Sequence, residues 1–454
     1  SRGVWTHGVE AATEVFWLRA MSGGNLLIGS NGTITAMGRG YAENSGPGKG
    51  VGGSHGGRGY DDTVSLRANG PCYGSIVAPT NLGSGGGGGR GGFGGGAIRM
   101  AVSGQVRHDG AIDADALSGG HSRGAGGSVY LTTGSLIGTG SIMARGAGVK
   151  NTQSPGGGGR IALVVTNAGA KFDGFTGSLL ACGGRAYDGV SGAGAGTIYL
   201  ETSSDSPGKG DLIVNNNNNG SAGSFYNVYT ELGGSAAVTC EFSRITLTNG
   251  GILAIISNNT LVATNTGFLG GGGIQISDGT MQVPSDFAYS NIFIGISSTG
   301  ATFNPALSLT IGTNAEFRVD QPYSMTGDVI VASGGNLTHT VNGSTEAYKL
   351  NLTVNGSLII KSGGRVDATG RGYAQRYGPG YGAGGSHGGR GYDDTKSCPA
   401  NGPCYGSIIA PTNLGSGGFL GNGAPGGGAI RLTVSGQIRD DGAVAADALP
   451  GGTS

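Results

Sequence analysis

The sequence predicts an all-β fold, a parallel β-helix or β-solenoid with Gly-rich corners, built from a tandem repeat of about 332 residues. Gly makes up 102 of the 454 residues, without the Gly-X-Y period of collagen. The block at residues 38–120 recurs at 370–452 without an insertion, and about three-quarters of the aligned positions are identical. Short alternating strands, separated by Gly-rich or Asn-Gly turns, recur roughly every 20 to 37 residues, which is typical of a solenoid.

Charge and hydropathy exclude several functional classes. Lys plus Arg and Asp plus Glu each number 27, and only 12% of residues are charged, so electrostatic binding to nucleic acid or to an anionic membrane is not expected. No apolar run approaches the roughly 20 residues that span a bilayer, so we expect no membrane insertion. Leu26–Ile28 matches Leu358–Ile360 in the same register. We therefore expect this sequence to be a window from a longer periodic chain, whose start is processed or cropped.

Residues 1–24 are expected to be the end of a preceding strand-rich unit. Within them, Val15–Met21 is predicted to be a strand, and Glu10–Glu14 is the one segment that fits a helical turn. Residues 25–215 are predicted to be the first Gly-rich β-solenoid segment, whose strands each follow a Gly-rich turn. The predicted strands are Ala97–Met100, Val129–Leu131, Arg160–Leu163, Thr197–Leu200, Ala111–Ala114, Ser141–Ala144 and Ser178–Ala181.

Residues 216–357 are predicted to be a strand-rich β-helix segment, and residues 358–454 a second, truncated Gly-rich copy. The Asn run within 211–220 fits either an exposed loop or a stacked Asn ladder inside the coil. The turns that follow the strands would also fit β-hairpins, but their spacing favours a parallel β-helix. The predicted strands are Ile245–Thr248, Ile274–Ile276, Leu307–Ile311, Asp328–Val331 and Leu350–Val354.

Five cysteines are an odd number, so they cannot all pair within one chain. Cys398 and Cys404 flank a Pro-Ala-Asn-Gly-Pro turn and are candidates for a local disulfide. Cys72 lacks that partner in the first copy. Cys182 and Cys240 are a second candidate pair if the fold brings them together, and free buried thiols are the alternative.

Sequons favour a secreted glycoprotein and therefore an extracellular or cell-surface location. The candidate N-glycosylation sites are Asn31, Asn219, Asn258, Asn336, Asn342, Asn351 and Asn355.

The densest polar cluster occurs in both copies. It consists of His55, Arg58, Asp61 and Asp62 with His387, Arg390, Asp393 and Asp394. We favour a structural interpretation, a salt-bridged and hydrogen-bonded Gly-rich loop. The four aspartates are candidate Ca²⁺ ligands, although no cofactor is required. Adjacent carboxylates on a strand point to opposite faces, which is poor geometry for a glycosidase acid–base pair, so we expect no catalytic residue and no enzyme.

A second set of carboxylates also offers oxygen ligands for Ca²⁺. Asp109, Asp113 and Asp115 lie close in sequence, but Ala445 replaces Asp113 in the second copy, so a repeated site would lose one ligand.

The sequence segments GGSHGG, YGS, APTNLGSGG, GGGAIR and VSG resemble the glycine-rich repeats of large secreted or surface structural proteins with parallel β-helix folds. The resemblance covers 38–120 and 370–452 closely and 121–200 loosely. It implies an extracellular structural or adhesive protein, and it supplies no catalytic residues.

These observations predict a structural subunit of an extracellular filament, surface hair or sheath that assembles by tandem or axial stacking. A mastigoneme-like flagellar hair is one concrete case. We expect a homopolymer, head-to-tail or lateral, with glycans attached or bound. At about 25 residues and about 4.8 Å per coil, one period would be roughly 60 Å long.

Two alternative functions remain open. One is a β-helix polysaccharide lyase or hydrolase. The other is an adhesin or carbohydrate-binding stalk, in which aromatic side chains stack on sugars. The candidate aromatic residues are Tyr60, Tyr73, Tyr377, Tyr381 and Tyr405.

Overall fold

The computed structural model describes residues 4–8, 17–60, 70–87, 91–117, 122–148, 154–185, 192–219, 228–233, 237–392, 402–419 and 423–450. All regular structure in these ranges is β, which confirms the predicted all-β class. No helix in the same ranges is long and apolar enough to cross a membrane. The chain divides into two compact units, residues 1–274 and 275–454, a boundary that differs from those predicted at 24, 215 and 357.

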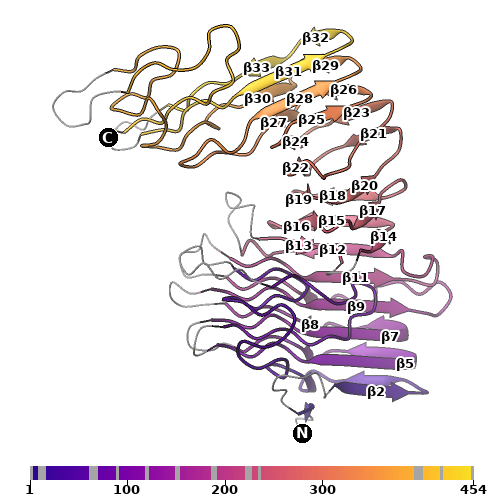
Figure 1. The fold of residues 1–454 in the computed structure, drawn as a ribbon. Coiled ribbons are helices and arrows are strands. Elements are labelled where there is room, and N and C mark those ends of the chain that lie inside the picture. Colours follow the sequence, from indigo (N-terminus) through magenta and orange to yellow (C-terminus); the bar gives the residue numbers. More distant parts are fainter. Residues whose placement is uncertain are drawn as a thin grey trace. The chain divides into compact units, whose positions relative to one another are not determined.

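The larger sheet of the first unit grows by parallel pairing of strands in chain order. Figure 1 shows β2, β5, β7, β9 and β11 stacked in this order, and β3 pairs with the second half of β5. Its strands are β2 (Leu18–Ser22), β3 (Leu26–Ile28), β5 (Ala97–His108), β7 (Ser128–Ile137), β9 (Arg160–Val165), β11 (Thr197–Glu201), β12 (Asp211–Asn215), β15 (Arg244–Thr248) and β18 (Gly267–Gly270).

One pairing in this sheet departs from the predicted parallel pattern. Strands β11 and β12 are antiparallel, because the chain reverses between residues 202 and 210. The pairs β12–β15 and β15–β18 are parallel again. The reversal lies at the junction that the sequence marks near residues 211–220.

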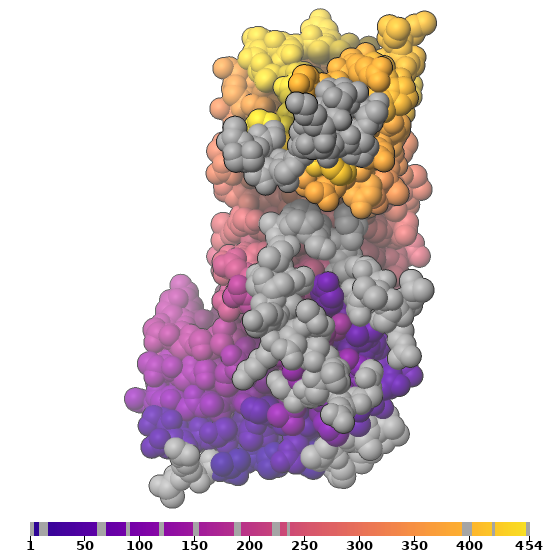
Figure 2. All heavy atoms as spheres, turned by 90° about the vertical axis from the view of Figure 1, so that its left-hand side faces the viewer, coloured from indigo at the N-terminus to yellow at the C-terminus, as the bar shows by residue number. Residues whose placement is uncertain are grey.

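The second sheet of the first unit is parallel throughout, in the order β1-β4-β6-β8-β10. On the left side of Figure 2 the surface changes from indigo to magenta along one direction, as successive segments stack in this unit. The remaining strands are β1 (Val4–Trp5), β4 (Thr33–Thr35), β6 (Ala111–Asp113), β8 (Ser141–Met143), β10 (Ser178–Leu180), β13 (Thr230–Glu231), β14 (Thr239–Glu241), β16 (Ile252–Ile255), β17 (Thr260–Val262) and β19 (Gly273–Ile276).

The core of the first unit lies between these two sheets and consists of columns of aliphatic side chains. Each column forms because in-register parallel strands place equivalent residues one above another. Each buried Ile, Leu or Val stabilises the fold by about 1.5–3 kcal/mol. One column is Leu18, Ile98, Val129, Ile161 and Ile198, and the facing column is Ile34, Ile112, Ile142 and Leu179.

A column of glycines precedes the strands of the larger sheet. Gly96, Gly127, Gly159 and Gly196 each stand directly before β5, β7, β9 and β11. A Cβ atom at Gly127, Gly159 or Gly196 would lie 1.9, 2.1 or 1.7 Å from the carbonyl oxygen of the preceding glycine in the column. Glycine is therefore required here for close backbone contact, not for a special φ angle.

The second unit adds strands in groups of three. Strands β28, β29 and β30 pair in parallel with β25, β26 and β27, and β31, β32 and β33 then pair with β28, β29 and β30 (Figure 1). The strands of this unit are β20 (Thr280–Gln282), β21 (Asp286–Tyr289), β22 (Phe293–Ile296), β23 (Ser308–Ile311), β24 (Glu316–Val319), β25 (Tyr323–Met325), β26 (Asp328–Val331), β27 (Asn336–Thr338), β28 (Leu350–Val354), β29 (Leu358–Ile360), β30 (Arg365–Asp367), β31 (Ile430–Val434), β32 (Ile438–Asp440) and β33 (Ala443–Ala445).

Asn and Asp occupy many corners between strands, since they tolerate a positive φ better than other non-Gly residues. The Asn249 corner joins β15 to β16, which belong to different sheets, so this turn does not form a hairpin. The corner residues with positive φ include Asn249, Asn258, Asp278, Asn291 and Asn314.

The Asn run forms an exposed turn with one inward-facing Asn, and no Asn ladder occurs inside the protein among the described residues. Asn216 is fully buried, where its Oδ1 accepts from Gly183 N–H at 3.0 Å and its Nδ2 donates to a carbonyl. Asn217 and Asn218 form an exposed turn with positive φ. Asn249 Nδ2 donates to Asn215 Oδ1 at 3.0 Å, which is one rung of an Asn ladder on the outside.

The predicted strands listed above all occur. The strand predicted at Val15–Met21 is observed as β2, shifted toward Ser22, and its first two residues lie outside the described ranges. The helical turn predicted at Glu10–Glu14 also lies outside them.

We predict that Gly196→Ala destabilises the first unit by about 1–3 kcal/mol or more, because the new methyl group overlaps the Gly159 carbonyl. Gly267→Ala is the matched control, since its methyl group meets no atom within 4 Å. Denaturant-induced unfolding of both variants measures the difference. Equal stability of the two variants would contradict the requirement for close backbone contact.

Candidate functional site

His55 lies at the centre of a buried, hydrogen-bonded cluster in the first Gly-rich copy. Its Nδ1–H donates to the Gly126 carbonyl at 2.7 Å, and its ring centroid lies 4.7 Å from that of Tyr73. The Tyr73 hydroxyl donates to the Leu82 carbonyl at 2.5 Å and lies 2.8 Å from Ser84 Oγ. Burial lowers the pKa of His55 to about 3, and nearby Arg160 acts in the same direction, so the ring is neutral near pH 7.

The second copy repeats this local arrangement. The rings of His387 and Tyr405 lie 4.9 Å apart, and the Tyr405 hydroxyl donates to the Leu414 carbonyl at 2.5 Å and lies 2.7 Å from Ser416 Oγ. His387 is only partly buried, whereas His55 is fully buried. The hydrogen bonds of the tyrosine hydroxyl groups are therefore local to the Gly-rich block, while the burial of the histidine depends on what surrounds the block.

Arg58 forms the salt bridge that the structural interpretation predicts, but its partner is distant in sequence. Arg58 Nη1 lies 2.8 Å from Glu231 Oε1, across 173 residues. Glu231 Oε2 accepts the Cys72 backbone N–H at 2.8 Å. Burial raises the pKa of Glu231, and Arg58 opposes this rise. The sequence around Arg58 gives no indication that Glu231 is its salt-bridge partner.

Arg160, at the start of β9, lies fully buried beside this cluster. Its Nε donates to the Tyr73 carbonyl at 2.9 Å, and its Nη1 donates to Thr197 Oγ1 at 3.1 Å. Burial lowers the pKa of Arg160. The side chain thereby connects the loop around Tyr73 to strands β9 and β11, which is a structural role.

The candidate Ca²⁺ ligands do not form a site in the described ranges. No group of three or more His, Cys, Asp or Glu side chains that would hold a metal ion occurs there. Asp109 binds Arg107 at 2.8 Å, and Asp115 binds Arg145 at 2.6 Å. Burial, together with the charge of Asp115, raises the pKa of Asp113 to about 6. Four candidates lie outside the described residues: Asp61, Asp62, Asp393 and Asp394.

The cysteines that the structure describes are free thiols. Cys182 and Cys240 do not pair, so the disulfide suggested for them is absent from the structure. Cys404 is free and exposed, and its candidate partner Cys398 lies outside the described residues. Cys72, which occupies the position equivalent to Cys404, is buried.

The candidate glycosylation sites differ in exposure. Asn31, Asn258 and Asn355 are exposed. Asn342 is buried, and its Nδ2 donates to two backbone carbonyls at 2.8 Å, so this prediction does not fit the folded chain. Asn219 Nδ2 donates to the Gly183 carbonyl at 3.0 Å. Asn336 and Asn351 are partly buried.

The candidate sugar-stacking tyrosines also differ in exposure. Tyr377 and Tyr381 are exposed, and Tyr60 is partly buried. Tyr73 is buried and Tyr405 partly buried, and the hydroxyl group of each is hydrogen-bonded. The last two therefore pack within the Gly-rich block instead of presenting their rings to a ligand.

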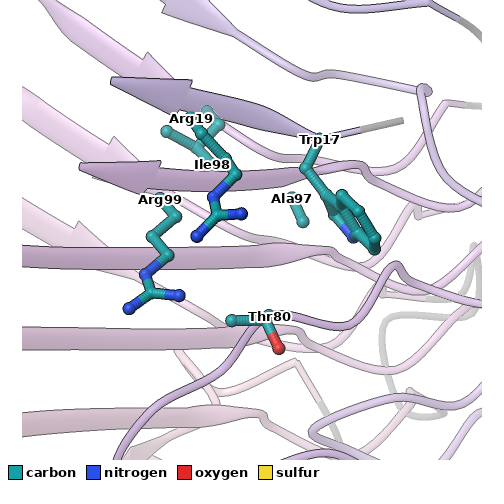
Figure 3. Close-up of a pocket in the computed structure, with 6 residues that line it drawn as sticks. All are labelled: Trp17, Arg19, Thr80, Ala97, Ile98 and Arg99. Atoms are coloured by element: carbon teal, nitrogen blue, oxygen red, sulfur yellow. The ribbon is translucent and has the colours of Figure 1, made fainter. Parts of the chain in front are cut away.

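A small cavity opens on the outer face of the first unit's larger sheet. Its volume is about 190 Å³. Figure 3 shows the Trp17 ring and the guanidinium group of Arg19 on either side of Ala97, with Arg99 next to Arg19 on the neighbouring strand. Thr80, Ala97 and Ile98 complete the wall. Residues 17, 80 and 99 are distant in sequence, so the chain alone gives no signal that they meet.

No family model, curated protein or solved structure matches this chain.

We predict that the two equivalent thiols react at very different rates. Burial raises the pKa of the Cys72 thiol, whereas Cys404 is exposed. Iodoacetamide at pH 8 should modify Cys404 at least about a hundredfold faster than Cys72, which becomes reactive only on unfolding. Mass spectrometry of the peptides measures both rates in one sample. Similar rates would contradict the burial of Cys72.

We predict that acid destabilises the second unit through His339. Burial, helped by Arg371, lowers the pKa of His339 to about 4. In the unfolded chain the His pKa is about 6.5, so between pH 4 and 6.5 the unfolded chain binds more protons than the folded chain. The unfolding free energy therefore falls as the pH drops from 6.5 to 4, by on the order of 3 kcal/mol. Denaturant unfolding at pH 7.5 and 4.5 measures the loss, and His339→Gln should reduce it. An unchanged loss in His339→Gln would assign the effect to other groups.

Proposed function

We propose that the chain is a structural subunit of an extracellular filament, surface hair or sheath, built as a parallel β-solenoid that assembles by stacking of coils. One observation carries the proposal: each passage of the chain through the second unit adds one strand to each of three sheets, always in parallel. A comparison of the two copies shows which side chains a further coil would cover. Ile76 is 5% exposed, whereas Ile408 in the second copy is 99% exposed. Val106 is buried, whereas its equivalent Ile438 is 62% exposed.

The pairing of the second unit's strands supports a solenoid. Each passage of the chain adds one strand to each of three sheets, first β25–β27, then β28–β30, then β31–β33. All six pairings are parallel, which is the pattern that successive coils of a β-solenoid produce.

The strands β31, β32 and β33 each pair with a single strand among the described residues. In the first copy the equivalent strands have a further neighbour, since β5 pairs with β7 and β6 pairs with β8. Unpaired strand edges and exposed apolar groups favour addition of another strand layer. A further coil, from the same chain or from a neighbouring subunit, would cover Ile438 and Val444.

Surface chemistry supports an extracellular assembly. The formal net charge is zero, so subunits repel one another little as they stack. The exposed sequons at Asn31, Asn258 and Asn355 are available for glycans, which would coat the outside of the filament.

We predict that electron microscopy of the native material reveals filaments with an axial repeat of about 60 Å, set by one 332-residue period at about 4.8 Å per coil. Isolated rods that never associate, at any protein concentration, would overturn the proposal.

A matched pair of variants tests whether stacking uses the β31–β33 end. Ile438→Lys with Val444→Lys should prevent assembly, because the equivalent Val106 and Ile112 are fully buried in the first copy, so a further coil would have to bury two unpaired charges. Thr433→Lys, on the exposed outer face of β31, is the control and should still assemble. Assembly of both variants to the same extent would exclude this end as the contact.

A further inference from the structure

Two arginines face each other on the outer side of the larger sheet in the first unit. Arg19 on β2 and Arg99 on β5 are register partners in parallel strands, and both are exposed. Like charges at directly opposed positions destabilise a sheet. Neither side chain forms an ion pair with a residue in the described ranges.

Several other arginines on strands of this protein have an acidic neighbour. Arg244 faces its register partner Asp211 and forms an ion pair with it. Arg365 pairs with Asp367 at 2.6 Å within β30. The Arg19–Arg99 pair therefore concentrates positive charge at one place on a chain whose net charge is zero.

The surroundings of this pair are shaped to receive a ligand. The two guanidinium groups and the Trp17 ring border the cavity of about 190 Å³ (Figure 3), and Trp17 is 45% exposed. The Arg99 guanidinium lies 5.6 Å from the centre of the Tyr130 ring, a cation–π contact that orients it. An anionic group between the arginines would replace their repulsion by two charge-assisted attractions.

We propose that this cavity, which we call the arginine–tryptophan cavity, binds an anionic sugar unit, a pyranose ring that carries a carboxylate or a sulfate. Guanidinium groups bind planar or tetrahedral oxyanions through two parallel hydrogen bonds. The indole ring supplies a flat apolar surface for the C–H face of the sugar. The cavity is smaller than the roughly 300–1,000 Å³ of drug-sized sites, so it accommodates one sugar ring.

Single-stranded nucleic acid also combines anionic groups with flat rings, but the observations favour a sugar. Nucleic-acid binding requires a track of several cations along the phosphate backbone. Among the described residues that border the cavity, only Arg19 and Arg99 are cationic, and the net charge of the chain is zero. The inference is independent of the filament proposal, because an isolated chain would bind as well as an assembled one.

The second copy lacks two of the residues that border this cavity and supplies an internal control. The equivalents of Trp17, Arg19 and Arg99 are Lys349, Asn351 and Arg431. Asn351 is the register partner of Arg431, and Lys349 forms an ion pair with Glu346, so neither the arginine pair nor the aromatic ring is repeated. We therefore expect the anionic-sugar site in the first copy and not at the equivalent place in the second.

The test is calorimetric titration of the full chain with three oligosaccharide probes: oligogalacturonate, a sulfated galactan oligosaccharide and a neutral galactan oligosaccharide. At least one charged probe should bind at one site per chain and at least about tenfold more tightly than the neutral probe. Which of the two charged probes binds more tightly shows whether the cavity prefers a carboxylate or a sulfate. Binding should weaken with added salt.

Variants then assign the binding to this cavity. Arg19→Gln with Arg99→Gln, and separately Trp17→Ala, should each lower the affinity at least about tenfold. Arg431→Gln is the matched control and should bind as the unchanged chain does. Arg19→Gln alone should also weaken binding, while its Tm should not fall because the substitution removes a like-charge contact, and this separates loss of binding from loss of folding.

Several results would overturn the proposal. These are no saturable binding of either charged probe, equal binding by the double arginine variant, and an equal loss in Arg431→Gln. Tight binding of oligothymidylate without binding of either charged sugar would instead assign the cavity to nucleic acid.

Discussion

Backbone-to-backbone contact between successive Gly-rich segments is the constraint on which the rest of the first unit depends. The N–H groups of Ser128, Arg160 and Thr197 donate at 2.9–3.1 Å to the carbonyls of the glycines that precede the neighbouring strands. Because each glycine stands directly before a strand, this contact sets the register at which the next strand begins. The aliphatic columns of the core follow from that register, since equal starting points place Ile98, Val129 and equivalent side chains above one another.

The two Gly-rich copies separate the effect of local sequence from that of tertiary surroundings. Both copies form the same His–Tyr contact and the same tyrosine hydrogen bonds, because these involve residues within about 30 positions of one another. Burial differs at the same positions: Cys72 is enclosed, whereas Cys404 is open to solvent. Chemical properties that depend on desolvation, such as thiol reactivity, are therefore decided by the segments packed around each copy and not by the repeated sequence.

Charge is used sparingly, and several of the ion pairs are local. Arg107, Arg365 and Arg439 each bind an aspartate two residues away, on the same side of the strand. Such exposed pairs contribute little stability, but they keep the outer faces neutral where segments stack. The exposed Arg19–Arg99 pair departs from this pattern. Packing does not explain two arginines at opposed positions, so we attribute them to the chemistry of this surface.

The sequence by itself determined the all-β class, the positions of most strands and the Gly and Asn corners, because strand alternation and φ preferences are local properties. It also identified His55 and Arg58 as part of a structural cluster. Only the tertiary structure decided that Glu231 completes this cluster, that β12 runs antiparallel to β11, and that Arg19 opposes Arg99. The physical reason is that pairing between distant segments depends on how the whole chain folds and in which register its strands meet. The local periodicity of the sequence does not encode this.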